Sequence, residues 1–130
     1  MADGVVYVPV VNAPTTYASP EESSSGFGTR LGSFKSQLVA IDAATGEIFW
    51  DVELPGDAFG AATVVNDLVF TSVLSGLILA LNRETGETVW KYQAPGGING
   101  WPAFAEDRLI VPVGFGEPPV LLALELLGGP

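Results

Sequence analysis

Short apolar runs, separated by turns rich in polar residues and glycine, follow one another along the whole chain. The runs are only a few residues long, and many alternate between apolar and polar residues, which is typical of β-strands. Thr-Gly, Asn-Asp, Pro-Gly and Ser-Gly pairs lie between the runs and favour tight turns. We therefore expect an all-β protein of ten strands, at residues 5–10, 37–42, 47–54, 61–65, 68–73, 77–82, 87–93, 102–105, 108–113 and 120–126.

The pattern repeats with a period of 40 residues. From Leu38 to Gly76, 11 of the 39 residue pairs at this offset are identical, among them Trp50 with Trp90. Four short strands in a unit of about 40 residues are the signature of a β-propeller blade. We predict about two and a half four-stranded antiparallel blades of an incomplete propeller: a partial blade at 1–56 with a loop insertion at 11–37, a blade at 57–96, and a partial blade at 97–130.

Ten strands are too few to close a ring, because propellers close at roughly four to eight blades. An open stack would expose apolar blade faces and strand edges to water. We therefore expect either a piece of a longer chain, whose remaining blades complete the propeller, or self-association with copies of the same chain. A measurement of the solution mass separates these two interpretations.

Composition and charge exclude several classes of function. Five Lys and Arg against 15 Asp and Glu give a net charge of −10, which argues against nucleic acids and anionic membrane surfaces as partners. No apolar run approaches the ~18 residues of a transmembrane helix. The chain contains no Cys and no His, which excludes disulfides, thiolate metal sites, c-type haem attachment and imidazole catalysis.

A tryptophan motif is the most specific feature of the sequence. The pattern Ala-x-(Asp/Asn)-x-x-Thr-Gly-x-x-x-Trp occurs twice, at Ala40, Asp42, Thr45, Gly46 and Trp50, and at Ala80, Asn82, Thr85, Gly86 and Trp90. It resembles the tryptophan-docking motif of the quinoprotein (PQQ-type) β-propeller family, and the resemblance covers nearly the whole chain apart from the insertion. It implies an eight-bladed parent. A tryptophan packed between blades buries about 150–250 Å², and its N–H needs a carbonyl acceptor.

Two further stretches resemble the C-terminal blades of quinoprotein alcohol dehydrogenases. Asn12 lies just past the strand at 5–10, and in that family an Asn in a similar place approaches the quinone. Trp101 lies in a glycine-rich segment that resembles the one leading into a late inner strand. The resemblance implies a parent that binds PQQ and Ca²⁺, with Asn12 and Trp101 as cofactor-binding residues. An ordinary loop role for Asn12 and core packing for Trp101 are the open alternatives.

The catalytic Asp and the Ca²⁺ ligands of that family have no match in this chain. Other carboxylates could bind a hard cation, namely Glu21, Glu22, Asp51, Glu53, Asp57, Glu106 and Asp107. We interpret Glu106 and Asp107 as a hairpin turn, and Glu21 and Glu22 as solvated residues of the Ser-rich insertion. We therefore expect no catalytic and no metal-binding residue here, and no cofactor bound by the chain alone.

The leading hypothesis is a C-terminal segment of a PQQ-dependent alcohol dehydrogenase-like propeller, whose full-length parent transfers hydride from an alcohol to the quinone. The alternative is a non-catalytic scaffold for protein–protein interaction, similar to the lipoprotein that assists outer-membrane protein assembly. Residues 1–4 lack the positive charge of a signal peptide. Either the protein is cytoplasmic or its leader lies outside this chain; the resemblance implies a periplasmic location.

Overall fold

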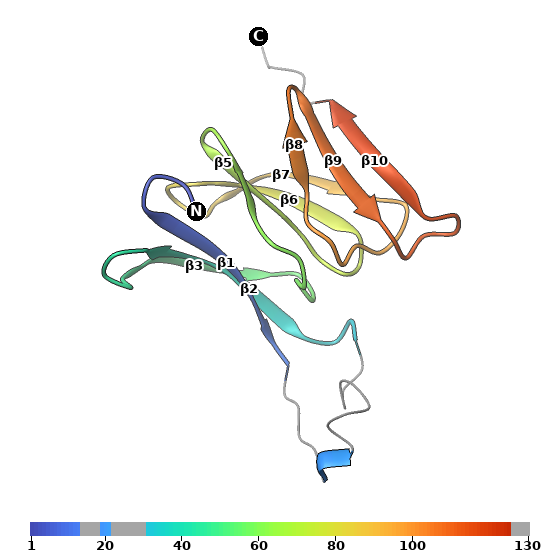
Figure 1. Cartoon of the computed structure of the whole chain (residues 1–130), viewed down its shortest axis with the longest axis horizontal. Coiled ribbons are helices and arrows are strands. Elements are labelled where there is room, and N and C mark those ends of the chain that lie inside the picture. The colour runs from blue at the N-terminus through green and yellow to red at the C-terminus, as the bar shows by residue number, and fades with distance from the viewer. Residues whose placement is uncertain (14–18, 22–30, 126–130) are drawn as a thin grey trace.

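Ten β-strands form three antiparallel sheets in the computed structural model, which describes residues 1–13, 19–21 and 31–125 (Figure 1). Sheet 1 has the order β1-β2-β3, sheet 2 the order β4-β5-β6-β7, and sheet 3 the order β10-β9-β8. The strands are β1 (Val5–Asn12), β2 (Lys35–Asp42), β3 (Ile48–Leu54), β4 (Thr63–Val65), β5 (Leu68–Ser72), β6 (Leu77–Asn82), β7 (Thr88–Gln93), β8 (Ala103–Ala105), β9 (Arg108–Val113) and β10 (Val120–Glu125).

The expected strands are confirmed in number and order, with differences at their ends. β1 continues to Asn12 and β2 already begins at Lys35, so both strands run into the predicted insertion. Asn12 is therefore the last residue of a strand, not a residue just past it, because it pairs with Lys35. β4 and β8 are shorter than expected. Most of the insertion (14–18 and 22–30) and the chain end at 126–130 lie outside the described residues.

The hairpin turns follow the repeat. Asp3, Asn66 and Glu106 have positive φ angles of 48°, 51° and 56°, a conformation that Asn and Asp tolerate better than most residues. Each precedes or begins the hairpin that leads into the second strand of a unit. The interpretation of Glu106 and Asp107 as a turn is therefore confirmed.

Two apolar cores hold the sheets together. The first lies between sheets 1 and 2 and includes Tyr7, Leu38, Val69 and Leu79, all buried. The second lies between sheets 2 and 3 and includes Phe70, Ile78, Leu109 and Val111. Because successive residues of a strand point to opposite faces, β5 and β6 contribute to both cores.

Among the described residues, sheet 2 is thus covered on both faces, whereas sheets 1 and 3 are each covered on one. This arrangement is that of neighbouring propeller blades, and the all-β architecture of about two and a half blades is confirmed. In the part of the chain that the structure describes, no helix has the length and apolarity needed to cross a membrane.

Candidate functional site

The two Thr-Gly turns have the same hydrogen-bonding pattern. The Asp42 carboxylate accepts hydrogen bonds from the backbone N–H groups of Ala44 and Thr45, at 2.8 and 2.7 Å. The Asn82 side-chain oxygen does the same for Glu84 and Thr85, at 2.9 and 3.0 Å. These bonds hold the pKa of Asp42 below its usual value of 3.8, Thr45 contributing the most.

Each turn is closed by a glycine in the left-handed region. Gly46 and Gly86 have φ angles of 78° and 75°. The hydroxyl oxygen of Thr45 accepts a hydrogen bond from the backbone N–H of Glu47 at 3.2 Å. The hydroxyl oxygen of Thr85 accepts one from the N–H of Glu87 at the same distance. The residues of the repeated motif therefore build two matching turns.

The turn of sheet 2 is covered by Trp50 of sheet 1. The indole N–H of Trp50 donates to the carbonyl oxygen of Arg83 at 3.0 Å, and the hydroxyl of Tyr7 lies 3.4 Å from the same oxygen. A Cβ atom on Gly86 would lie only 2.9 Å from the Trp50 ring and 2.8 Å from Val52. Glycine is thus needed at this position for close approach as well as for its backbone angle.

Arg83 adds an electrostatic link between the same two sheets. Its guanidinium forms an ion pair with Asp3 and donates to the carbonyl of Asn66 at 3.2 Å. The hydrogen bond to Asp3 raises the pKa of the Arg83 guanidinium above its usual value. Burial raises the pKa of the Tyr7 phenol, so this hydroxyl stays a donor.

The turn of sheet 1 is open by contrast. A Cβ atom on Gly46 would have no heavy atom within 4 Å, apart from its chain neighbours. The same turn therefore exists in a covered and an uncovered form in one molecule.

Trp90 occupies the position of Trp50 in the next sheet. In sheet 1, Ala40 pairs with Tyr7 on one side and with Trp50 on the other. In sheet 2, Ala80 pairs in the same way with Phe70 and Trp90. The Trp90 ring stacks on Tyr92, with centroids 6.0 Å apart, and meets Phe70 edge-on. Its N–H has no hydrogen-bond acceptor among the described residues, and a cavity of about 460 Å³ lies beside it, between β7 and the end of β10.

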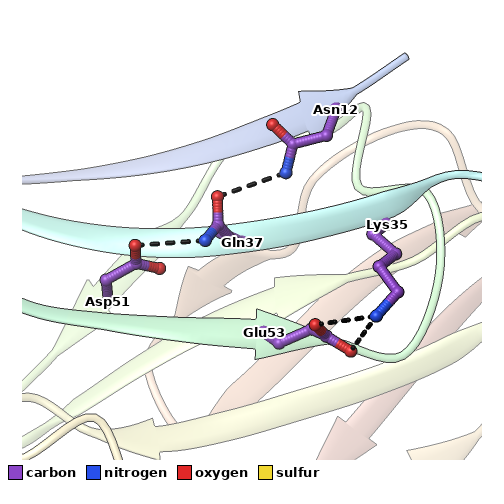
Figure 2. A network of polar contacts seen from close by, with 5 residues as sticks. All are labelled: Asn12, Lys35, Gln37, Asp51 and Glu53. Atoms are coloured by element: carbon purple, nitrogen blue, oxygen red, sulfur yellow. Dashed lines mark hydrogen bonds and ion pairs between the residues drawn. The ribbon is translucent and has the colours of Figure 1, made fainter. Parts of the chain in front are cut away.

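Asn12 belongs to a polar network on the face of sheet 1 that points away from sheet 2 (Figure 2). Its amide donates to Gln37 at 3.2 Å, and Gln37 donates to Asp51 at 3.1 Å. Lys35 and Glu53 form an exposed ion pair of 3.2 Å next to it. Exposed pairs of this kind contribute little to stability.

Asn12 ends β1 of sheet 1, whereas Trp101 lies in the loop before β8 of sheet 3. Its side chain is 60% exposed and lines a shallow apolar cavity of about 290 Å³ on the outer face of sheet 3, with Ile110, Pro112 and Leu121. The structure does not bring Asn12 and Trp101 into a shared pocket. Their role in cofactor binding therefore stays a prediction.

A cleft at the loop edge of the sheets was not expected from the sequence. Leu31, Phe59, Leu74, Asn99 and Phe115 line a hollow of about 310 Å³, and they come from loops beside all three sheets. Phe115 and Leu31 are 60% and 50% exposed. Aromatic and aliphatic residues in Gly-rich loops are the signal that could have indicated it.

Backbone hydrogen bonds fix the loops that form this loop-edge cleft. Leu74 donates to the carbonyl of Asp57 at 2.8 Å, and Phe115 donates to that of Gly97 at 3.1 Å. The Asp57 carboxylate, which is 1% exposed, accepts from the N–H groups of Gly32 and Phe34 at 2.5 and 2.8 Å. Asp57 therefore binds the end of the insertion, which positions Leu31.

The acidic residues do not gather into a site within the described ranges. No group of three or more Asp or Glu residues is close enough there to hold a metal ion. Asp51, Glu53 and Asp57 instead pair with Gln37, Lys35 and backbone N–H groups. Glu22 lies outside the described residues.

Comparison with solved structures supports the propeller architecture. BamB from Moraxella catarrhalis is 29% identical over 77% of this chain, with a TM-score of 0.57. A europium-containing methanol dehydrogenase is 21% identical over 70%, with a TM-score of 0.59. The quinohemoprotein alcohol dehydrogenase from Comamonas testosteroni is 19% identical over 87%, with a TM-score of 0.60. At these last two identities the likeness shows the fold alone.

The chain spans only part of each of these proteins: 29% of the BamB chain and 19% and 20% of the two dehydrogenase chains. No curated protein matches the chain significantly. A family model described as outer membrane protein assembly factor BamB matches residues 34–114, more than half of the chain. The chain therefore belongs to this family of PQQ-type propeller repeats.

Proposed function

We propose that this chain forms adjacent blades of a non-catalytic propeller scaffold that binds partner proteins during outer-membrane protein assembly. The family description and the 29% identity to BamB favour this function over a dehydrogenase. The observation that carries the proposal is the loop-edge cleft. It lies outside both inter-sheet cores, so the packing of the three described sheets does not fill it.

The occupant is an apolar side chain of a partner polypeptide. The cleft offers Leu31, Phe59, Leu74 and Phe115 as an apolar lining and Asn99 as one amide. Aromatic and aliphatic anchors in a pocket with a few polar groups are typical of binding hot spots. Strands of outer-membrane proteins alternate apolar and polar residues, and their apolar side chains match this lining.

The test is fluorescence anisotropy with a labelled peptide of about ten residues that has the alternating pattern of an outer-membrane strand. We expect saturable binding to the chain, weakened at least roughly fivefold by Phe115→Ser, since truncated hot-spot residues commonly cost more than 1 kcal/mol. Phe49→Ser is the matched control, because Phe49 is 51% exposed on β3, away from the cleft. Equal loss in both variants, or no binding by the parent chain, contradicts the proposal.

A segment of a quinoprotein alcohol dehydrogenase is the second candidate. The likeness of the fold to two such dehydrogenases and the strand that carries Asn12 favour it. The described residues do not fit PQQ by themselves, because the Asn12 amide is bound to Gln37 and Trp101 lines a separate cavity beside sheet 3. PQQ and Ca²⁺ in the parent would thus depend on other blades.

A titration with PQQ and Ca²⁺, followed by tryptophan fluorescence, separates the two candidates. A scaffold gives no saturable change. Saturable quenching that needs Ca²⁺ and is lost in Asn12→Ala supports the dehydrogenase, as does a change confined to Trp101.

The same comparisons support a proposal for the remaining partners and the location. We propose that the uncovered faces of sheets 1 and 3 pack against further blades of a parent propeller, in the periplasm, as the family implies. Self-association is the alternative. Light scattering decides between them, since a discrete multimer of the chain would favour self-association.

A further inference from the structure

Asn99 is followed by Gly100 in the loop between sheets 2 and 3. The chain contains four asparagines, at positions 12, 66, 82 and 99, and only Asn99 precedes a glycine. Glycine has no Cβ atom, so its backbone nitrogen is the least hindered nucleophile that can follow an asparagine.

The surroundings of Asn99 differ from those of Asn12 and Asn82, and its backbone conformation differs from that of Asn66. Asn99 is exposed and belongs to no strand, and its side chain has no hydrogen bond to another described residue. Asn12 ends β1 and donates to Gln37, and Asn82 ends β6 and caps a turn. Asn66 is held in a hairpin with a positive φ angle.

The backbone nitrogen of Gly100, the nucleophile that follows Asn99, is not engaged in a hydrogen bond within the described ranges. The N–H of Gly100 has no acceptor within the described ranges, whereas its carbonyl accepts from the Ser72 hydroxyl at 3.1 Å. The nitrogen of Gly100 is therefore not protected by a secondary-structure hydrogen bond, which is the usual protection of a backbone amide in a strand.

We propose that Asn99 is a site of spontaneous covalent modification by deamidation. The Gly100 backbone nitrogen loses its proton and attacks the side-chain carbonyl carbon of Asn99, which forms a carbon–nitrogen bond and expels the side-chain nitrogen as ammonia. Water then opens the resulting succinimide at either carbonyl, giving Asp or isoaspartate. The net reaction consumes one water and releases one ammonia, with no oxidant or reductant.

The product has a consequence for the loop-edge cleft. A carboxylate replaces the one amide among its lining residues, beside Phe59, Leu74 and Phe115. Charge next to an apolar lining disfavours apolar ligands, because a bound ligand removes water from the charge. The isoaspartate product also lengthens the backbone between Ile98 and Trp101.

The experiment incubates the full chain in warm, mildly alkaline buffer and measures deamidation of each asparagine by peptide mapping with mass spectrometry. The other three asparagines are internal controls in the same sample. We expect Asn99 to react at least roughly tenfold faster than any of them, because only it precedes a flexible residue in an exposed loop. Anion-exchange chromatography should resolve a more acidic form that grows at the same rate.

Two further variants sharpen the result. Asn99→Gln should abolish the acidic form, since the longer side chain cannot close the same five-membered ring readily. Asn12→Gln should leave it unchanged. A rate at Asn99 no faster than at the other asparagines, or an acidic form that persists in Asn99→Gln, overturns the proposal. Neither outcome depends on whether the scaffold function holds.

Discussion

The two contacts between neighbouring sheets use side chains at the same repeat positions but differ in what lies next to the tryptophan. Between sheets 1 and 2, Trp50 covers Gly86 and donates to the Arg83 carbonyl. Between sheets 2 and 3, Trp90 lies beside a cavity of about 460 Å³ and has no acceptor among the described residues. The Trp50 indole thus adds a directional hydrogen bond to the apolar burial of the first contact, whereas the Trp90 ring stacks on Tyr92 of its own strand β7 and packs against the apolar core between sheets 2 and 3. Among the described residues, the same motif thus gives two indoles with different hydrogen bonding.

The largest expected effect comes from removing the two indoles. Trp50→Ala should lower the free energy of unfolding by about 4 kcal/mol, within the range for large-to-small aromatic changes. Trp90→Ala should cost about 1 kcal/mol less, since one hydrogen bond contributes about that much. Urea denaturation followed by circular dichroism measures both. An equal loss in the two variants would mean that the Arg83 carbonyl contributes nothing.

Substitutions of the two turn glycines test the contact of Trp50 at the turn that it covers. Gly46→Ala should cost about 1 kcal/mol, since its φ angle is left-handed but its surroundings are open. Gly86→Ala should cost about 3 kcal/mol, because the added methyl group also meets Trp50 and Val52. In a Trp50→Ala background most of this difference should disappear. If it persists, the clash with the ring is not its cause.

A buried hydroxyl group distinguishes the two contacts by a smaller change in the free energy of unfolding. Thr71 Oγ1 is buried without a hydrogen-bond partner among the described residues, and Thr71 lies on the same side of β5 as Val69 and Val73. Thr71→Val should therefore raise stability by about 1 kcal/mol. Ser72→Ala is the matched control and should lower it by about 1 kcal/mol, because Ser72 donates to Gly100. Both are measured as shifts of the urea midpoint at constant slope.

The smallest effect is a pH dependence that only one of the two turns possesses. The pKa of Asp42 is lowered in the folded chain, so its contribution is present above the usual value of 3.8 and is lost as the pH falls through the folded value. Asn82 does not titrate. The amide resonance of Thr45 should therefore shift more in acid than that of Thr85, its counterpart in the other turn. Asp42→Asn should remove the shift, and its persistence would assign it to another group.

The repeat explains why so much of the fold was predictable. The number, the order and the turns of the strands follow from local alternation and the Thr-Gly signal, which depend on neighbouring residues. The inward and outward faces of sheet 2 follow from the same alternation. The strand extension to Asn12 was missed because the loop-like composition from Val11 to Gln37 suggested an earlier end.

The candidate site was less accessible to such reasoning. The loop-edge cleft joins Leu31, Leu74 and Phe115, which lie in three loops separated by about forty residues each, and no local pattern shows that they converge. The donors of the hydrogen bonds to the Asp57 carboxylate could not be predicted either, because backbone N–H groups are present at almost every residue and give no sequence signal. Positions that depend on how whole sheets are placed need the three-dimensional structure.

The contact between Trp50 and Arg83 also determines how long the apolar face of sheet 1 stays exposed during translation. The two residues are 33 positions apart, so sheet 1 cannot bury the face that carries Trp50 until the next unit has been synthesised. At the usual pace of translation this interval is roughly 2 to 7 s. During that time Leu38, Ala40 and Trp50 stay open to water or to a chaperone. The apolar face of each repeat unit is thus buried only after the following unit has been synthesised.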